Sequence, residues 1–195
     1  MTRLAEAKLT VPEAAYVAGV TEKIVNREID ARIMRVIGRS RHRAVSGLDV
    51  LYLGATRDVR EDMSPQLRKR LHDAITTAVK EARKIAKLDM FELPIAAVEK
   101  EMRQQFDTLE RMKRDLIESR AGVRAGEPVV KGTRIPARQI ADLVRQGAKS
   151  EELQHEFDLT REQIEAAIIF DRVTPKRGRP RIRKLRVTEH VPADR

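Results

Sequence analysis

The chain of 195 residues contains no cysteine, and only 3% of its residues are aromatic. The lack of cysteine excludes a disulfide framework, a thiolate metal site and a cysteine nucleophile, and it fits the reducing environment of the cytoplasm. The scarcity of aromatic side chains leaves little surface on which unpaired bases could stack. This argues against a dedicated binder of single-stranded RNA.

Long hydrophobic runs are also missing. No uninterrupted apolar stretch approaches the roughly 18 residues of a membrane span. The N-terminus, which contains Glu6 and Lys8, lacks the apolar stretch of a signal peptide. The length suffices for one large or two small domains. We therefore expect a soluble, cytoplasmic protein.

Catalytic patterns are absent as well. The four histidines lie in different predicted elements and share no ligand spacing: His42, His72, His155 and His190. The sequence has no zinc-protease, P-loop or nucleophile-elbow motif. Its many carboxylates lie on helix faces beside Lys and Arg, where solvated ion pairs are the default. We expect no catalytic residue, no metal, no cofactor and no enzymatic activity.

What the chain does have is positive charge. Its net charge of +10 and pI near 10.2 indicate an acidic partner, nucleic acid first. Residues 174–195 hold eight Lys or Arg against Glu189 and Asp194, a net charge of +6 that leaves +4 for the other 173 residues. A basic tail on a nearly balanced body is typical of a phosphate-binding extension. The alternative is a tail that only aids solubility.

The first segment is predicted to contain two short helices joined by a turn. Thr10 is a suitable N-cap with Glu13 as its capping-box partner, and Gly19 can end the first helix. Thr21 then caps a second helix over residues 22–29. A helix, a glycine-containing turn and a second helix form the arrangement that places a recognition helix in the major groove.

The second helix offers polar side chains on its outer face. Ile24, Val25 and Ile29 are expected to face inward, so Lys23, Asn26 and Arg27 point away from the apolar stripe. We predict that these three side chains contact DNA.

Residues 33–37 and 43–45 are predicted to form two strands around a basic turn. Arg39 and Arg41 at its tip would then grip phosphate, and Ser46 would cap a helix over residues 47–53. This order of elements over residues 8–55 resembles the winged helix-turn-helix of the MerR and excisionase group. Another small α+β module is the alternative.

The middle of the chain is predicted to be a long helical linker. A helix over residues 64–87 begins with the cap Ser64 and Pro65, a strand follows at 90–95, and a charged helix covers 98–119. The last helix carries a narrow apolar seam at Phe106, Leu109, Met112 and Leu116. Narrow seams usually face a partner helix. We favour a homodimer here over a contact within one chain.

A glycine-rich motif precedes three predicted helices near the C-terminus. Gly126 and Gly132 are expected in turns around a short strand at residues 129–130. Helices are predicted over residues 139–146, 151–157 and 161–170, the last two capped by Ser150 and Thr160. Their expected apolar face includes three side chains of the last helix: Ile164, Ala167 and Ile168.

The pattern Gly-x-Pro-x-x-x-Gly-Thr-Arg-Ile-Pro of this motif, with the capped helices after it, resembles a bacterial family catalogued as a domain of unknown function and found as antitoxins. The resemblance covers about residues 118–172. It implies a VapB-type partner of a PIN-like ribonuclease toxin, and it implies toxin contacts at the motif core: Gly132, Thr133, Arg134, Ile135 and Pro136. Whether Arg134, Arg138 and Lys149 touch phosphate, toxin carboxylates or solvent stays open.

The basic tail contains a pattern that resembles the AT-hook of chromatin proteins. Its core is Arg177, Gly178, Arg179, Pro180 and Arg181. A glycine lets the backbone lie deep in a narrow groove, and the flanking arginines reach along its A·T-rich floor. Two alternatives remain: a general electrostatic clamp on phosphate, or an arm inserted into the acidic active site of a toxin.

Together these patterns predict a mainly α protein. Its parts are a winged helix-turn-helix (1–55), a helical linker and dimerisation region (56–117), a three-helix, helix-turn-helix-like domain (118–173) and a basic tail (174–195). We expect an antitoxin that binds operator DNA and neutralises a PIN-like ribonuclease. The alternative is an architectural or excision-type DNA-binding regulator without a toxin.

Overall fold

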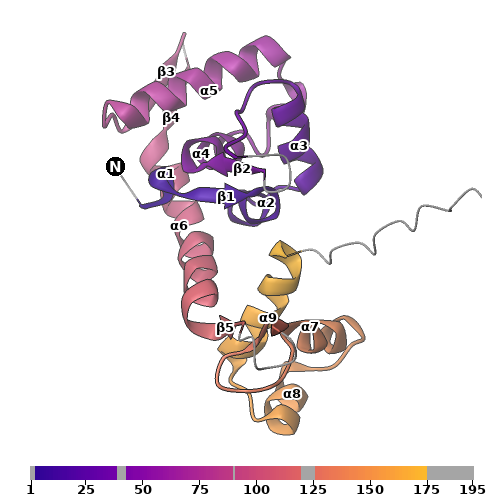
Figure 1. Cartoon of the computed structure of the whole chain (residues 1–195). Coiled ribbons are helices and arrows are strands. Elements are labelled where there is room, and N and C mark those ends of the chain that lie inside the picture. Colours follow the sequence, from indigo (N-terminus) through magenta and orange to yellow (C-terminus); the bar gives the residue numbers. More distant parts are fainter. Residues whose placement is uncertain (1–2, 39–42, 90, 120–125, 175–195) are drawn as a thin grey trace, which may run out of the picture.

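The computed structural model describes residues 3–38, 43–89, 91–119 and 126–174. Within them the protein is mainly helical, as predicted, with three small antiparallel sheets of two strands each (Figure 1). No helix in these ranges has both the length and the apolar character needed to cross a bilayer.

The N-terminal part begins with four elements joined by short connections: α1 (Arg3–Glu6), β1 (Lys8–Thr10), α2 (Val11–Ala18) and α3 (Glu22–Asp30). The backbone N–H of Thr10 donates to Glu13 Oε2 over 2.8 Å and so starts α2. Gly19 ends it with a φ of 67°, in the left-handed region that glycine adopts without strain. The hydroxyl of Thr21 accepts from the N–H of Ile24 and caps α3. The predicted caps are confirmed.

The predicted strand over residues 33–37 is wrong. Strand β2 (Ala44–Ser46) pairs instead with β1, with Lys8 opposite Ser46. Only a single bridge between Ile37 and Ala44 remains of the expected hairpin. The physical reason lies at the end of α3, because the N–H groups of Ile33 and Met34 donate to the carbonyl of Glu28 and are not available to a sheet.

Helix α4 (Gly47–Ala55) forms as predicted behind the cap Ser46. The N–H of Ser46 donates to Asp49 Oδ2 over 2.8 Å, which completes a capping box. A Cβ at Gly47 would lie 1.6 Å from the carbonyl oxygen of Leu4. Only glycine therefore allows α1 to pack against the start of α4.

The middle of the chain holds a 3₁₀ turn, two helices, two strands and a π-helical turn: η1 (Arg60–Asp62), α5 (Pro65–Lys80), β3 (Ile85–Leu88), β4 (Phe91–Pro94), α6 (Ile95–Arg111) and η2 (Met112–Leu116). Helix α5 is shorter than predicted, because Ala82 adopts a left-handed φ of 54° and the chain leaves the helix. The residues after it form β3, which pairs with β4.

The apolar seam of α6 is buried within the chain. Phe106, Leu109 and Met112 are at most 4% exposed. Helix α6 contacts α2 and α4, and η2 contacts α9 (Arg161–Val173). Since the seam faces its own chain, it no longer supports the predicted dimer. The predicted linker also packs against the N-terminal helices.

The C-terminal part consists of a two-stranded sheet and three helices: β5 (Ile117–Glu118), β6 (Val129–Val130), α7 (Ala137–Arg145), α8 (Ser150–Phe157) and α9. Gln163 completes the capping box of Thr160, as predicted. Ser150 is the first residue of α8 rather than its cap, which falls on Lys149. Of the predicted apolar face, Ile164 and Ala167 are buried, but Ile168 is 37% exposed.

Candidate nucleic-acid interface

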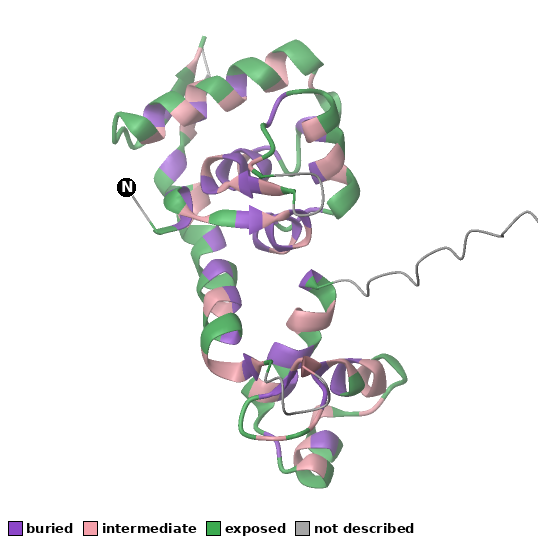
Figure 2. Cartoon of the chain, in the orientation of Figure 1, coloured by how far each residue is buried: buried purple, intermediate pink, exposed green. Residues whose placement is uncertain are grey.

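Helix α3 turns a polar face to solvent, as Figure 2 shows. Lys23 and Arg27 are exposed and Asn26 is half-buried, while Val25 and Glu28 on the other side of the helix are buried. The three side chains predicted to contact DNA therefore share one face. The side-chain amide of Asn26 donates to the carbonyl of Glu22 over 3.0 Å in this structure.

Arg27 has an acidic partner. Its guanidinium forms an ion pair with Glu61 of η1, and both side chains are largely exposed. The hydrogen bond from Arg27 lowers the pKa of the Glu61 carboxyl, and the same bond raises the pKa of Arg27. A DNA phosphate would have to compete with this carboxylate for Arg27.

We predict that Glu61→Gln strengthens DNA binding. The change releases Arg27 from an exposed ion pair of modest strength, so the affinity for a duplex should rise about two- to five-fold. Fluorescence anisotropy with a labelled duplex would measure this rise. Asp62→Asn, an equal charge change beside it on η1, is the control. An equal rise in both variants would assign the effect to the general electrostatic field rather than to Arg27.

The position of α3 is fixed by a buried charge cluster around Glu28. The Tyr52 hydroxyl donates to Glu28 Oε2 over 2.9 Å, and Arg68 forms an ion pair with Oε1. Arg60 Nε lies 4.0 Å from the same Oε1, and the Glu28 and Arg60 side chains are almost completely buried. Burial raises the pKa of Tyr52 and lowers that of Arg60. The cluster thus joins α3 to α4, η1 and α5.

Arg60 also fastens η1 to the end of α4. Its Nη2 donates to the carbonyl of Leu53 over 2.6 Å and to Thr56 Oγ1 over 2.8 Å. Sequence analysis missed this cluster, because it treated charged helix residues as solvated. A signal was present, since Glu28 lies three residues after Val25 and four after Ile24, within the apolar stripe of α3.

Beyond α3 the chain runs through what we call the basic segment, residues 31–43. It contains five arginines and no acidic residue. Arg32, Arg35 and Arg43 are exposed, and none of them forms an ion pair with a residue that the structure describes. The predicted contacts Arg39 and Arg41 lie outside the described residues.

The middle of the basic segment pairs with the residue that follows its end. The N–H of Ile37 donates to the carbonyl of Ala44 over 2.7 Å, and the reverse bond measures 3.2 Å. This pairing brings Arg35 and Arg43 onto neighbouring stretches of chain. Sequence analysis had named only the tip of the segment.

The Gly-Thr-Arg-Ile-Pro motif builds the turn that leads into α7. The Thr133 hydroxyl donates to the carbonyl of Val130 over 2.8 Å and accepts from the N–H of Ile135. Gly132, at a φ of 81°, donates its N–H to Glu118 Oε1. Pro136 was predicted to contact a toxin, but its side chain is buried and is not available to a partner. Gly132 and Arg134 are exposed.

The other cations of this part have different surroundings. Lys149 is exposed. The guanidinium of Arg138 is largely buried, with Nη1 3.7 Å from Asp171 Oδ1, so it is not a solvated arginine. On α9, Glu162 and Glu165 are exposed and pair with Arg111 and Arg161.

No metal site is evident in the described residues. None of the groups of His, Asp and Glu side chains there brings three or more together in a way that could hold a metal ion. The AT-hook pattern Arg177–Arg181 falls outside these residues.

Among known proteins, a family model matches the C-terminal part of the chain alone. Residues 117–170 match the model of a family described as "Protein of unknown function (DUF433)". This agrees with the resemblance of the motif to a domain of unknown function. Neither a curated protein nor a solved structure matches the chain.

Proposed function

We propose that this protein is the antitoxin of a bacterial type II toxin–antitoxin pair. In this proposal α3 and the basic segment bind operator DNA, and the part that matches DUF433 holds a PIN-like ribonuclease toxin. A two-fold symmetric operator would require two copies of the chain. The two copies would contact each other at a surface other than the seam of α6, because that seam is buried within a single chain.

The basic segment carries the DNA-binding half of the proposal. Arginines that neutralise phosphates release counterions, which supplies most of the affinity for duplex DNA whatever its sequence. Side chains on an exposed helix face then provide base contacts. Here five arginines without an intervening acid lie directly after α3, whose Lys23 and Asn26 face outward. Both kinds of contact are thus available on consecutive stretches of the chain.

The C-terminal part suits a protein partner better than DNA. Residues 118–173 contain nine Lys or Arg against ten Asp or Glu. Helices α8 and α9 follow each other like the helices of a helix-turn-helix. The second of them exposes Glu162 and Glu165, each paired with an arginine, so it offers phosphate no excess of positive charge. The resemblance to antitoxins supplies the identity of the proposed partner.

The main alternative is an architectural or excision-type regulator that has no toxin. The basic segment and the basic tail are both positively charged, and the tail alone has a net charge of +6. They favour this alternative as much as they favour an antitoxin. Co-expression with the product of the neighbouring gene separates the two. An antitoxin co-purifies with that protein and blocks its ribonuclease activity, whereas the alternative requires no such complex.

We predict that Arg134→Glu separates the two proposed activities. Arg134 is exposed at the motif turn, and its charge reversal should reduce co-purified ribonuclease at least about ten-fold, the cost of a lost charge-assisted contact at an interface. The affinity for DNA should change less than about two-fold, because α3 lies in another part of the chain. Pull-down and anisotropy would measure the two effects.

Arg83→Glu is the matched control, an exposed arginine between α5 and β3. It should retain the ribonuclease. If Arg134→Glu retains it equally well, the motif turn does not bind the toxin. The assignment of the toxin to this surface is then wrong.

A further inference from the structure

The middle of the chain contains an apolar cavity of about 170 Å³. Its walls come from helix α5, from the strands β3 and β4, and from the stretch between the end of α4 and the residue after η1. Helix α5 contacts both α4 and β3, so the fold holds these walls together. Of the described residues that line the cavity, none belongs to α3 or to the motif turn.

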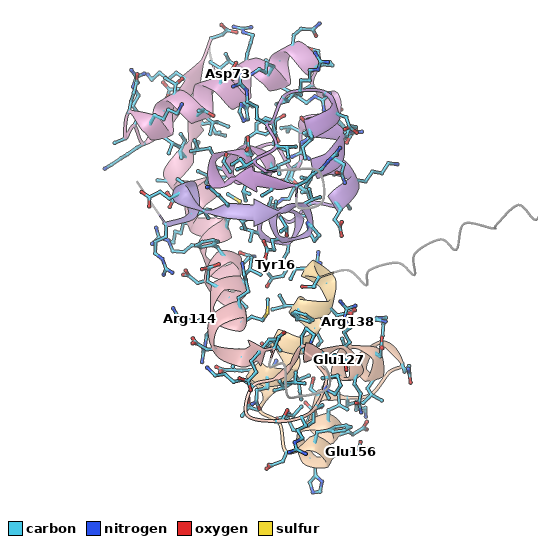
Figure 3. The ribbon with its side chains drawn as sticks, viewed as in Figure 1. Tyr16, Asp73, Arg114, Glu127, Arg138 and Glu156 are labelled. Carbon is cyan, nitrogen blue, oxygen red and sulfur yellow. The ribbon has the colours of Figure 1, made fainter. Side chains whose placement is uncertain are left out.

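Helical spacing turns one face of α5 toward this cavity. Leu67 and Leu71 lie about one turn apart and both line it. Lys69 and Asp73 form an ion pair on the opposite, exposed face of the helix, and Figure 3 labels Asp73 on α5. The wall contributed by α5 is therefore the apolar side of an amphipathic helix.

Two alanines in the walls leave the cavity unfilled. Ala55 ends α4, and Ala86 lies on β3 and is 2% exposed. Protein interiors contain few voids larger than a water molecule, and the atoms that line such a space lack dispersion partners on one side. A ligand that fills the cavity would supply these contacts.

The lining suits an uncharged ligand. All the described residues that line the cavity are apolar except Glu92. The carboxylate of Glu92 already forms an ion pair, with Oε1 2.7 Å from Lys87 Nζ. A water molecule in the cavity would find few partners, because a buried water usually makes two to four hydrogen bonds. A charged ligand would lose its hydration without gaining a partner of opposite charge.

The size of the cavity and one residue of its wall favour an aromatic ring. An apolar cavity of about 150 Å³ is large enough to bind benzene. Met63 lines the cavity, and its thioether can make favourable contacts with an aromatic ring. Val59, also in the wall, is 47% exposed. A ligand that covers such a side chain removes apolar surface from water, which favours binding.

We propose that this cavity is a binding site for a small, uncharged molecule with a single aromatic ring. The site goes beyond the proposed function and does not depend on it. It adjoins η1, because Val59 directly precedes this turn and Met63 directly follows it. Arg60 of η1 belongs to the buried cluster around Glu28. A bound ring would therefore contact both ends of the turn that helps to hold α3.

Benzene is the probe, and its binding to the full chain is followed through the amide signals in NMR spectra. We expect saturable shifts with a dissociation constant of about 1 mM or below. The shifted signals should include those of η1 and β3 and leave out those of α8, which lies at the far end of the C-terminal part in Figure 1. Benzoate has the same ring and a charge, so it should bind at least about ten-fold more weakly.

Two variants fill the cavity from different walls. Ala55→Leu and Ala86→Leu should each raise the dissociation constant of benzene at least about ten-fold, because the added carbons occupy the space of the ring. Ala97→Leu makes the same change at an exposed position of α6. This matched control should bind benzene within about two-fold of the unchanged chain. Circular dichroism confirms that each variant is folded.

Three results would overturn the proposed site. The first is the absence of saturable shifts in the unchanged chain. The second is equal affinity for benzene and benzoate, which would mean that the probe does not enter an apolar cavity. The third is benzene binding that neither filling variant weakens, which would place the ring elsewhere. If one filling variant does not fold, the other variant and the comparison with benzoate still decide.

Discussion

Glu28→Ala is expected to lower the free energy of unfolding by about 3–5 kcal/mol, the usual effect of removing one partner from a buried ion pair. Glu28 is fully buried, and its loss would leave the guanidiniums of Arg60 and Arg68 without their carboxylate. The hydroxyl of Tyr52 would also lose its acceptor. Urea denaturation of the full chain followed by circular dichroism measures the change.

Two further variants serve as controls for Glu28→Ala. Glu22→Ala removes an exposed carboxylate from the same helix and should cost less than about 1 kcal/mol. Glu28→Gln keeps the shape of the side chain but not its charge, so a loss close to that of alanine assigns the effect to charge. A loss below about 1 kcal/mol for Glu28→Ala would mean that water replaces the carboxylate and that the cluster does not fix α3.

Replacing Arg32, Arg35 and Arg43 together with alanine is expected to weaken duplex binding by about two orders of magnitude at 0.1 M salt. Each phosphate contact adds about 0.9 to the slope of log affinity against log salt concentration. The three substitutions should therefore flatten this slope by about 2.7. Anisotropy titrations at several salt concentrations give both quantities.

The matched control removes three exposed arginines away from α3, namely Arg83, Arg103 and Arg161. The loss of net charge is the same, but we place none of these side chains near phosphate. The slope should therefore change by less than one unit. Equal slopes for the two triple variants would show that the basic segment acts only through the net charge of the protein.

The helix starts were predictable because their chemistry is local. Each cap and its partner lie three residues apart, as in Thr10 with Glu13 or Thr160 with Gln163. Such a pair can be identified in the sequence without knowing what packs around it. The mainly α class followed from the same local signals.

The strand partners could not be predicted in this way. Strand β2 has a residue pattern that fits a hairpin with residues 33–37, yet it pairs with β1 from the start of the chain. Residues Ile85–Leu88 continue the helical apolar pattern of α5 and equally fit a half-buried strand. In both cases packing between distant segments decides, and a short apolar run carries no information about it.

The candidate interface was predicted in part. The outward face of α3 followed from helical spacing, which placed Lys23 and Arg27 opposite Val25. The pairing of Arg27 with Glu61 joins residues 34 positions apart, and the packing of Arg172 on the Tyr16 ring joins residues 156 positions apart. Such contacts depend on the tertiary fold, so a single sequence does not reveal them.

The salt dependence of duplex binding by the full chain tests the central claim most directly. If the five arginines of the basic segment meet phosphates, the slope of log affinity against log salt concentration should be about −4.5 or steeper. Binding should saturate on double-stranded DNA and be weaker on single strands, for which few aromatic side chains are present. A slope near zero, or no saturable binding to duplex DNA at 0.1 M salt, would contradict the account.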